Sequence, residues 1–199
     1  MVKGSERRHA DHPIHTQFLD RWSPRAFTGE AVSEAELFTL FEAARWAPSA
    51  GNGQPWRILY ARRDTPQWPV FFDFLYDGNK VWATRAAALL VVLSDSMMDG
   101  KEGKPPRANE THAFDAGAAW MSLALQGSLM DLGVHGMAGF DHEAVRAALG
   151  VPSRFHVNAM VAVGRPGSPE LLPEPVRQRE APNDRRPVAQ SVREGKFDF

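Results

Sequence analysis

The pattern of apolar and polar positions predicts a chain of mixed helices and strands. Within residues 37–44 the apolar side chains recur three and four positions apart, which is the spacing of one helical face. Ser33 and Glu36 precede that stretch with the spacing of a capping box, so a helix is expected to begin there. Pro48 is expected to end it, because proline disfavours helix at the residue before it.

Three further helices are predicted from apolar content and from stop signals. Residues 112–132 are apolar almost all the way round, which is typical of a buried helix, and Gly133 is expected to terminate it. An aspartate at its first position caps a shorter helix over residues 141–149. Residues 14–22 are expected to form a helix that stops ahead of Pro24.

Four segments predict strands. Residues 86–93 are apolar without interruption, as in a central strand that is buried on both faces. Shorter strands are expected at residues 56–61, 134–138 and 157–164. Because helices and strands do not alternate regularly, we expect an α+β protein with three layers rather than a doubly wound sheet.

The other segments carry weaker signals. Residues 64–85 are mixed, and their aromatic side chains are expected to pack on the body of the protein. Residues 95–110 contain Gly, Pro, Lys and Asp and predict a mobile loop. Residues 165–199 have few apolar side chains, so they are expected to be disordered or to lie across a partner.

Composition limits the class of protein. A chain of 199 residues with 43% hydrophobic residues is long enough for one domain with a sizeable core. A net charge of −1 leaves no global signal for nucleic-acid binding, and the absence of cysteine excludes disulfides and thiolate chemistry. No apolar run is long enough for a bilayer, and the N-terminus lacks a signal-peptide pattern, so we expect a cytoplasmic protein without membrane contact.

Two motifs point to a phosphate and to a flat heterocycle. Residues 21–25 place two arginines around a serine in a turn-prone segment, which suits a phosphate but also fits a solvated turn. Residues 47–56 combine small residues, Gly and amides, and such a loop presents backbone N–H groups and carboxamides to a ring. An ordinary turn accounts for that loop about equally well.

Weaker motifs follow later in the chain. Arg185 and Arg186 form either a phosphate clasp or a basic tail, and the glycines of residues 136–141 permit close approach to a ligand or make a plain turn. The histidines at positions 9, 12 and 15 lie in a polar leader, and we do not interpret them as a metal site. With no nucleophile elbow and no paired carboxylates in the sequence, we predict no catalytic side chain.

These segments stand in the order found in the nitroreductase family, which the chain resembles over residues 14–195. The family's Arg-x-Ser-x-Arg-x-Phe stretch matches residues 21–27. Its Ala-Arg-x-Ala-Pro-Ser and Asn-x-Gln-Pro-Trp blocks match residues 44–49 and 52–56. The remaining matches are Asn79, the helix of residues 115–133, the segment 136–141 and Arg185-Arg186-Pro187.

The resemblance implies a three-layer α/β/α fold with a mostly antiparallel sheet, in an intertwined homodimer that holds noncovalent FMN at the subunit interface. It divides the chain into a flexible leader (1–13), one FMN-binding domain (14–180) and a C-terminal arm that reaches the partner (181–199). The residues implied to bind the cofactor are Arg21, Trp22, Ser23, Arg25, Pro48, Ser49, Ala50, Asn52, Gln54, Asn79, Ala138, Gly139, Arg185 and Arg186, with those of 48–52 coming from the partner subunit.

The implied reaction passes hydride from NAD(P)H through flavin N5 to a nitroaromatic, quinone or enone acceptor in a ping-pong cycle. Dehalogenation, flavin fragmentation and a non-catalytic FMN-binding module stay open as alternatives. Ala138 stands where some members have glutamate, and Ala50 replaces a common serine or threonine. These departures leave the acceptor undetermined.

Overall fold

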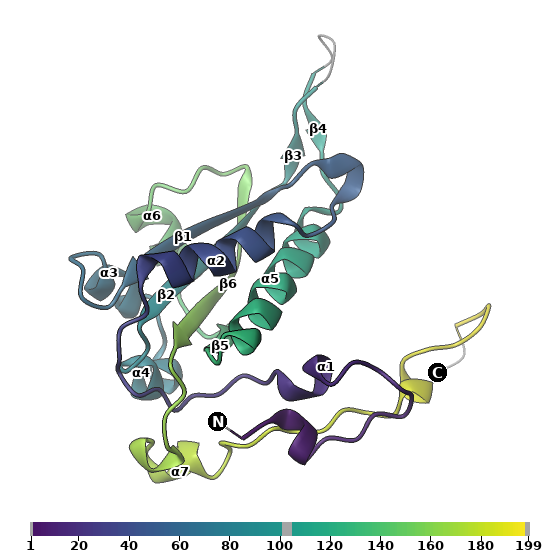
Figure 1. Cartoon of the computed structure of the whole chain (residues 1–199). Coiled ribbons are helices and arrows are strands. Elements are labelled where there is room, and N and C mark those ends of the chain that lie inside the picture. Colours follow the sequence, from purple (N-terminus) through teal and green to yellow (C-terminus); the bar gives the residue numbers. More distant parts are fainter. Residues whose placement is uncertain (1, 101–104, 198–199) are drawn as a thin grey trace.

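A four-stranded sheet forms the centre of the computed structural model, which describes residues 2–100 and 105–197. Its strands stand in the order β1-β2-β6-β5, and every neighbouring pair is antiparallel (Figure 1). Their bounds are β1 Trp56–Arg62, β2 Ala88–Asp95, β5 Gly133–Met137 and β6 Phe155–Gly164. The predicted strands and the antiparallel sheet are therefore confirmed.

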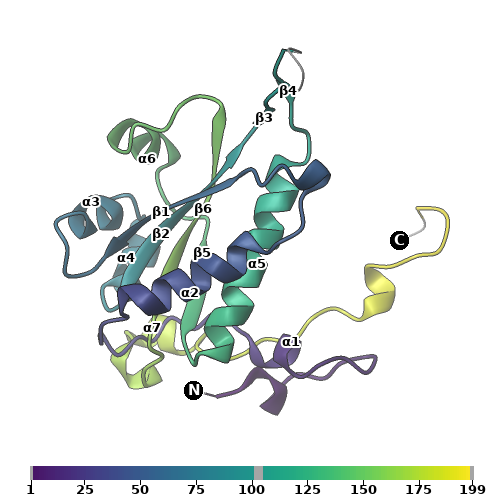
Figure 2. The same cartoon turned by 45° about the horizontal axis from the view of Figure 1, so that its top comes forward.

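Helices cover both faces of this sheet and complete three layers (Figures 1 and 2). One face carries α2 (Glu34–Arg45) and α5 (His112–Leu129), and the other carries α3 (Trp68–Asp73), α4 (Asp77–Ala83) and α6 (His142–Ala148). The α2 helix begins at the predicted capping box, in which the Ser33 hydroxyl accepts from the Glu36 N–H. The α+β class and the three-layer arrangement are confirmed.

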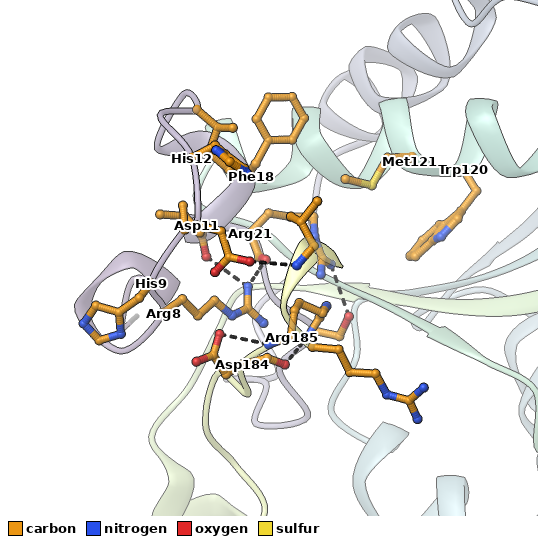
Figure 3. A pocket seen from close by; sticks show the side chains of 16 residues that line it. Arg8, His9, Asp11, His12, Phe18, Arg21, Trp120, Met121, Asp184 and Arg185 are labelled. Carbon is orange, nitrogen blue, oxygen red and sulfur yellow. Dashed lines mark hydrogen bonds between the residues drawn. The ribbon is translucent and has the colours of Figure 1, made fainter. Parts of the chain in front are cut away.

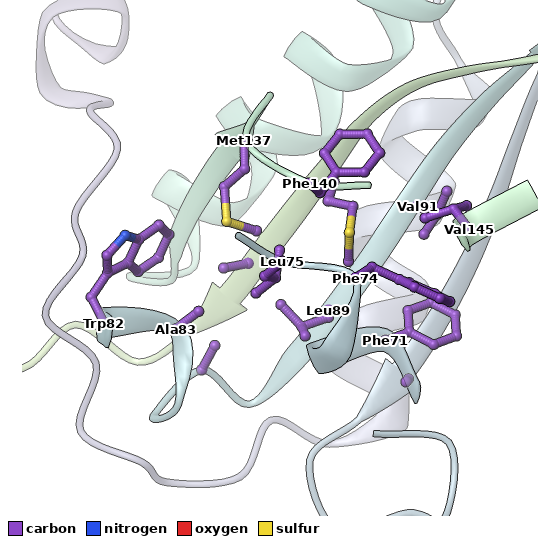
Figure 4. Close-up of a cluster of buried hydrophobic side chains, with 14 of the residues drawn as sticks. Phe71, Phe74, Leu75, Trp82, Ala83, Leu89, Val91, Met137, Phe140 and Val145 are labelled. Carbon is purple, nitrogen blue, oxygen red and sulfur yellow. The ribbon is translucent and has the colours of Figure 1, made fainter. Parts of the chain in front are cut away.

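Strand β2 lies between two hydrophobic cores, and every residue in it is buried. Leu89, Val91 and Leu93 face the α3, α4 and α6 layer, where they pack with aromatic side chains such as Phe71 (Figure 4). The intervening Ala88, Leu90 and Val92 face α2 and α5. Because side chains alternate across a strand, an uninterrupted apolar run is what a strand between two helical layers requires.

Shorter elements connect these layers and form the ends of the chain. They are η1 (Gly4–Glu6), α1 (Gln17–Asp20), η2 (Ala50–Asn52), β3 (Met97–Met98), β4 (Arg107–Ala108), η3 (Pro169–Leu171), α7 (Glu174–Arg177) and η4 (Val188–Gln190). Among the described residues, no helix is both long and apolar enough to cross a membrane.

The two ends of the chain run side by side and lead away from the sheet (Figures 1 and 2). We call residues 2–20 the N-terminal arm and residues 181–197 the C-terminal arm. The buried Arg8 guanidinium donates to the Asn183 carbonyl at 2.8 Å, and the Val188 N–H donates to Asp11 at 2.7 Å. These bonds fix the arms to each other.

The prediction of a helix over residues 14–22 is wrong in length. The helix that forms there is the shorter α1, Gln17–Asp20. Arg8 explains where it stops. Its guanidinium donates hydrogen bonds to the carbonyl oxygens of Leu19 and Arg21, at 2.9 and 2.7 Å. The backbone of Arg21 itself is extended. A long-range contact therefore replaces the helical partners that these carbonyls would otherwise have.

The stop signal of the long helix was also misassigned. Helix α5 ends at Leu129, and the left-handed residue after it is Asp131, with φ 55°. Gly133 instead begins β5, where a side chain would collide with the rings of Pro24 and Phe27. Gly133 is therefore needed for packing against the segment that carries Arg21 and Arg25.

Three weakly predicted segments have more structure than expected. Residues 64–85 form α3 and α4, with Phe71 and Phe74 buried. Within residues 95–110, β3 and β4 pair as a short hairpin, and residues 101–104 lie outside the described part of the chain. Leu172 and Val176 join the core, so the chain from residue 165 on is not entirely a tail.

Candidate functional site

Two adjoining cavities lie between β5, α4 and the chain around residues 21–25 and 179–185. The first, the cationic cavity, has a volume of about 630 Å³ and is lined by Arg8, Arg21, Trp22, Ser23, Arg25, His135, Arg179, Ala181, Pro182, Asn183 and Arg185. The second, the strand-edge cavity, has a volume of about 430 Å³ and is lined by Arg25, Tyr76, Gly78, Asn79, Trp82, His135, Gly136, Met137, Ala138, Gly139 and Arg179. Arg25, His135 and Arg179 line both cavities and mark their junction.

The segment of residues 21–25 is held in place by its backbone. The Glu180 carboxylate accepts from the N–H groups of Arg25 and Ala26, at 2.8 and 2.9 Å, and its side chain is only 2% exposed. The same carboxylate lies 3.9 Å from the Arg25 guanidinium. On the other side, the His135 ring donates from Nδ1 to the Pro24 carbonyl at 3.0 Å. The arginines therefore project from a fixed backbone.

Positive charge is concentrated in the cationic cavity. Burial lowers the pKa of Arg21, and the neighbouring guanidinium groups of Arg8 and Arg185 lower it further. Burial also lowers the pKa of Arg25, against the opposing effect of Glu180, and Arg179 adds to the lowering. In the described part of the chain Arg179 has no ion pair. Cations that are crowded in this way stabilise an anion placed between them.

His135 is neutral at the junction of the cavities. Burial lowers its pKa to about 4, and the charges of Arg25 and Arg21 act in the same direction, against the carbonyls of Pro24 and Ser23. Because Nδ1 carries the proton that is donated to Pro24, the Nε2 lone pair is left as an acceptor. Its ring packs on Trp82 with 4.7 Å between centroids.

Among the described residues, the strand-edge cavity contains one carboxamide, that of Asn79, beside the chain of residues 136–139. The Asn79 amide donates to the Gly139 carbonyl at 2.9 Å, and this bond ties α4 to the segment after β5. A Cβ on Gly139 would lie 2.9 Å from the Asn79 nitrogen, so the glycine permits this close approach. The wall offers backbone groups of residues 136–139 to a flat ligand.

The structure therefore brings together most of the residues predicted from the sequence. Trp22, in the same wall, uses its indole N–H internally, donating to the Val2 carbonyl at 3.0 Å. The predicted residues that line the two cavities are Arg21, Trp22, Ser23, Arg25, Asn79, Ala138, Gly139 and Arg185.

A third cavity, of about 620 Å³, lies between the arms and α5. Figure 3 shows Trp120 and Met121 of α5 on one side of it, and Arg8 and Arg185 on the other. Arg186 lines this third cavity rather than the cationic one.

The predicted residues of the loop 48–54 line none of these three cavities. The loop lies at the first turn of α5, where the Ala50 N–H donates to Asp115 at 3.2 Å. Residues 21–25 lie toward the other end of α5, since Gln17 just before them donates to the Leu125 carbonyl. Figure 1 shows the loop and the arms at opposite ends of the molecule.

The family model of the nitroreductase family matches residues 19–165. The chain belongs to the nitroreductase family. A relative from Thermus thermophilus, named NADH dehydrogenase, is 33% identical over 76% of this chain and 85% of its own length.

Two solved structures extend the similarity to the fold of this nitroreductase-family chain. A crystal structure described as an oxidoreductase containing FMN has a TM-score of 0.94 and 41% identity, and covers 99% of both chains. A structure from Desulfovibrio desulfuricans in complex with FMN has a TM-score of 0.72 and 26% identity, and covers 95% of this chain and 100% of that one.

In this nitroreductase-family chain the sequence reasoning missed four residues: Arg8, His135, Arg179 and Glu180. Arg8 and Glu180 are separated from residues 21–25 in sequence, and only the folded chain shows that both fix that segment. His135 alone had a usable signal, because it precedes the Gly136–Asp141 segment that was identified as a candidate.

Proposed function

We propose that the protein is an FMN-dependent oxidoreductase that passes hydride from NAD(P)H through flavin N5 to a nitroaromatic, quinone or enone acceptor. The observation that carries the proposal is the junction of the cationic cavity with the strand-edge cavity along β5. Membership of the nitroreductase family and the similarity to FMN-containing structures support it.

The residues present fit the parts of FMN. A phosphate matches the crowded guanidinium groups of Arg21 and Arg185 and the Ser23 hydroxyl, which already accepts from Arg21 at 3.2 Å. The isoalloxazine matches the strand-edge cavity, where Asn79 and the backbone at Gly139 offer donors and acceptors. The two cavities together would hold FMN without a covalent attachment.

The chain's own residues then bind and orient the cofactor. Arg25 and Arg179 line both cavities, so their positive charge would stabilise negative charge on a ligand that spans the junction. The Nε2 atom of His135 is available to accept a hydrogen bond from a ligand hydroxyl. No side chain is assigned as a general acid or base, and the bound flavin supplies the hydride transfer.

We propose that the working unit is a homodimer. Helix α5 exposes large apolar side chains, with Phe114 82% and Leu129 62% exposed, and its opposite face is buried against the sheet. The arms expose Ile14, Phe18 and Val192 in the same way. Exposed large apolar side chains of this kind are typical of a subunit interface, and a partner would provide the loop 48–54 that one subunit's cavities lack.

An absorption spectrum of the purified protein, followed by anaerobic titration with NADH and with NADPH, tests the proposal. We expect a yellow protein whose flavin absorption is bleached by at least one nicotinamide. A colourless protein that gains no thermal stability from added FMN would refute FMN binding. Binding without bleaching would indicate a non-catalytic module.

A panel of acceptors then separates the reactions. Fast reoxidation of the reduced protein by nitro compounds or quinones supports the proposed reaction. Turnover confined to a halogenated substrate, or loss of the flavin itself, would point to the specialised alternatives instead. The control variant for this panel is Arg21→Ala. It removes a guanidinium group of the cationic cavity and is expected to lose FMN.

A further inference from the structure

Asp115 is a buried acidic residue on α5. It lies in the first turn of α5, is 3% exposed, and has no ion pair in the part of the chain that the structure describes. Its Oδ2 accepts from the Ala50 N–H at 3.2 Å and faces the Thr111 hydroxyl at 3.1 Å. Burying an acidic side chain is costly unless hydrogen bonds compensate, so the partners of Asp115 decide what it does there.

The loop that Asp115 holds has an unusual backbone. Gly51, Asn52 and Gln54 all have left-handed φ angles, of 57°, 54° and 45°, and two of them are not glycine. Left-handed residues with side chains persist only where the surroundings hold them. The Ser49 hydroxyl accepts from the Gln54 N–H at 3.0 Å, and Asp115 holds the other end of the turn at Ala50.

The hydrogen bonds continue away from the loop. The Thr111 hydroxyl lies 3.1 Å from the Asn109 carboxamide oxygen as well as near Asp115, and its one hydrogen serves one of them at a time. Buried Asn109 joins the base of the β3–β4 hairpin, since its N–H donates to the Ser96 carbonyl at 2.8 Å. Asp115, Thr111 and Asn109 therefore connect the loop to the base of the hairpin through hydrogen bonds.

This loop is remote from the cavities of its own subunit. Asp115 and Leu125, which contacts the N-terminal arm, are separated along α5 by about 15 Å. In the homodimer proposed above, a two-fold axis perpendicular to α5 and near its middle would place the first turn of one helix beside the later turns of the other. The loop of one subunit would then face the cavities of its partner.

We propose that Asp115 is a positioning residue that holds the loop of residues 49–54 in the shape with which it contacts FMN bound in the partner subunit. This inference rests on the proposed function. Asp115 itself does not contact the cofactor. It acts on the loop through its hydrogen bond from the Ala50 N–H and through the left-handed turn that follows Ala50.

A simpler role for Asp115 is to stabilise the N-terminus of α5 as an acidic residue in its first turn. That role affects the stability of the subunit and leaves FMN affinity unchanged. Glu36 provides a matched control, because its carboxylate also accepts a backbone N–H at the start of a helix, from Ser33 at 2.8 Å. Glu36 lies outside the three cavities.

The first experiment compares Asp115→Asn, Thr111→Val and Glu36→Gln by FMN titration of the FMN-free proteins and by their thermal midpoints. We expect Asp115→Asn to weaken FMN binding by about tenfold and Thr111→Val to weaken it less. Glu36→Gln is expected to lower the thermal midpoint without a change in FMN affinity. Unchanged FMN affinity in both Asp115→Asn and Thr111→Val would overturn the inference, whatever their stability. A wild-type protein that does not bind FMN refutes the proposed function instead.

The second experiment uses mixed dimers isolated with two different tags. Asp115→Asn in one subunit and Arg21→Ala in the other leave one intact site, so we expect one FMN per dimer to bind with wild-type affinity. Both changes in the same subunit damage both sites, so no FMN is expected to bind with wild-type affinity. The opposite pattern would show that the loop serves its own subunit and would overturn the inference.

Discussion

Glu180→Ala removes the acceptor that holds the backbone of the arginine-bearing segment. The N–H groups of Arg25 and Ala26 donate to one carboxylate oxygen at 2.8 and 2.9 Å. Ala26 is almost fully buried, so water cannot replace that acceptor without opening the site. The variant is therefore expected to destabilise the fold from a position that lies outside the sheet.

The magnitude follows from the bonds lost. Two buried donors left without partners cost about 1–3 kcal/mol each. The Arg25 ion pair is long, at 3.9 Å, and that side chain is partly exposed, so its loss adds little. The other Glu180 oxygen is buried and has no hydrogen-bond partner among the described residues, and removing it recovers part of the loss. We expect Glu180→Ala to lower the free energy of unfolding by about 2–3 kcal/mol.

Glu180→Gln keeps an oxygen that can accept both N–H groups, but it loses the charge and puts an amide NH2 in place of the second oxygen. It is expected to cost about 1 kcal/mol, because hydrogen bonds to charged groups are stronger than neutral ones. Urea unfolding at one fixed protein concentration measures both variants, with Glu143→Ala on the exposed surface of α6 as the control. An alanine variant as stable as the Glu143→Ala control would refute the reasoning.

Three other predictions concern packing, pH and charge. Gly127→Ala places a methyl group inside contact distance of Val134 and is expected to lower the free energy of unfolding by about 1–2 kcal/mol. Gly117 faces open space on the same helix, so Gly117→Ala is expected to raise that free energy by up to about 1 kcal/mol. Thermal shifts of the same sign in both variants would contradict this. The pKa of His135 is about 4 against an ordinary 6.5, so only the unfolded chain takes up the proton as pH falls from 7 to 5. The free energy of unfolding of the FMN-free wild type is therefore expected to fall by about 2 kcal/mol over this range. Urea titrations at both pH values should show no such loss in His135→Gln. An equal loss in the variant would contradict it. Arg179→Gln is expected to weaken FMN binding about tenfold in a titration, and an unchanged dissociation constant would remove Arg179 from the site.

Local patterns determined much of the fold. The capping box at Ser33 and Glu36 set the start of α2, and the apolar run of β2 showed a strand between two helical layers. These features depend on neighbours in sequence, so a single chain displays them. The end of α1 depends on Arg8, and that contact crosses between segments, so periodicity could not reveal it.

The candidate site divides in the same way. The sequence by itself determined the motif residues Arg21, Ser23 and Arg25 and the loop 48–54, because each forms a short continuous segment of recognisable chemistry. Only the tertiary structure placed Arg179 beside Arg25 and separated the loop from its own subunit's cavities. The physical reason is that a cofactor site is assembled from groups brought together by packing. Charge crowding and burial exist only after the chain has folded.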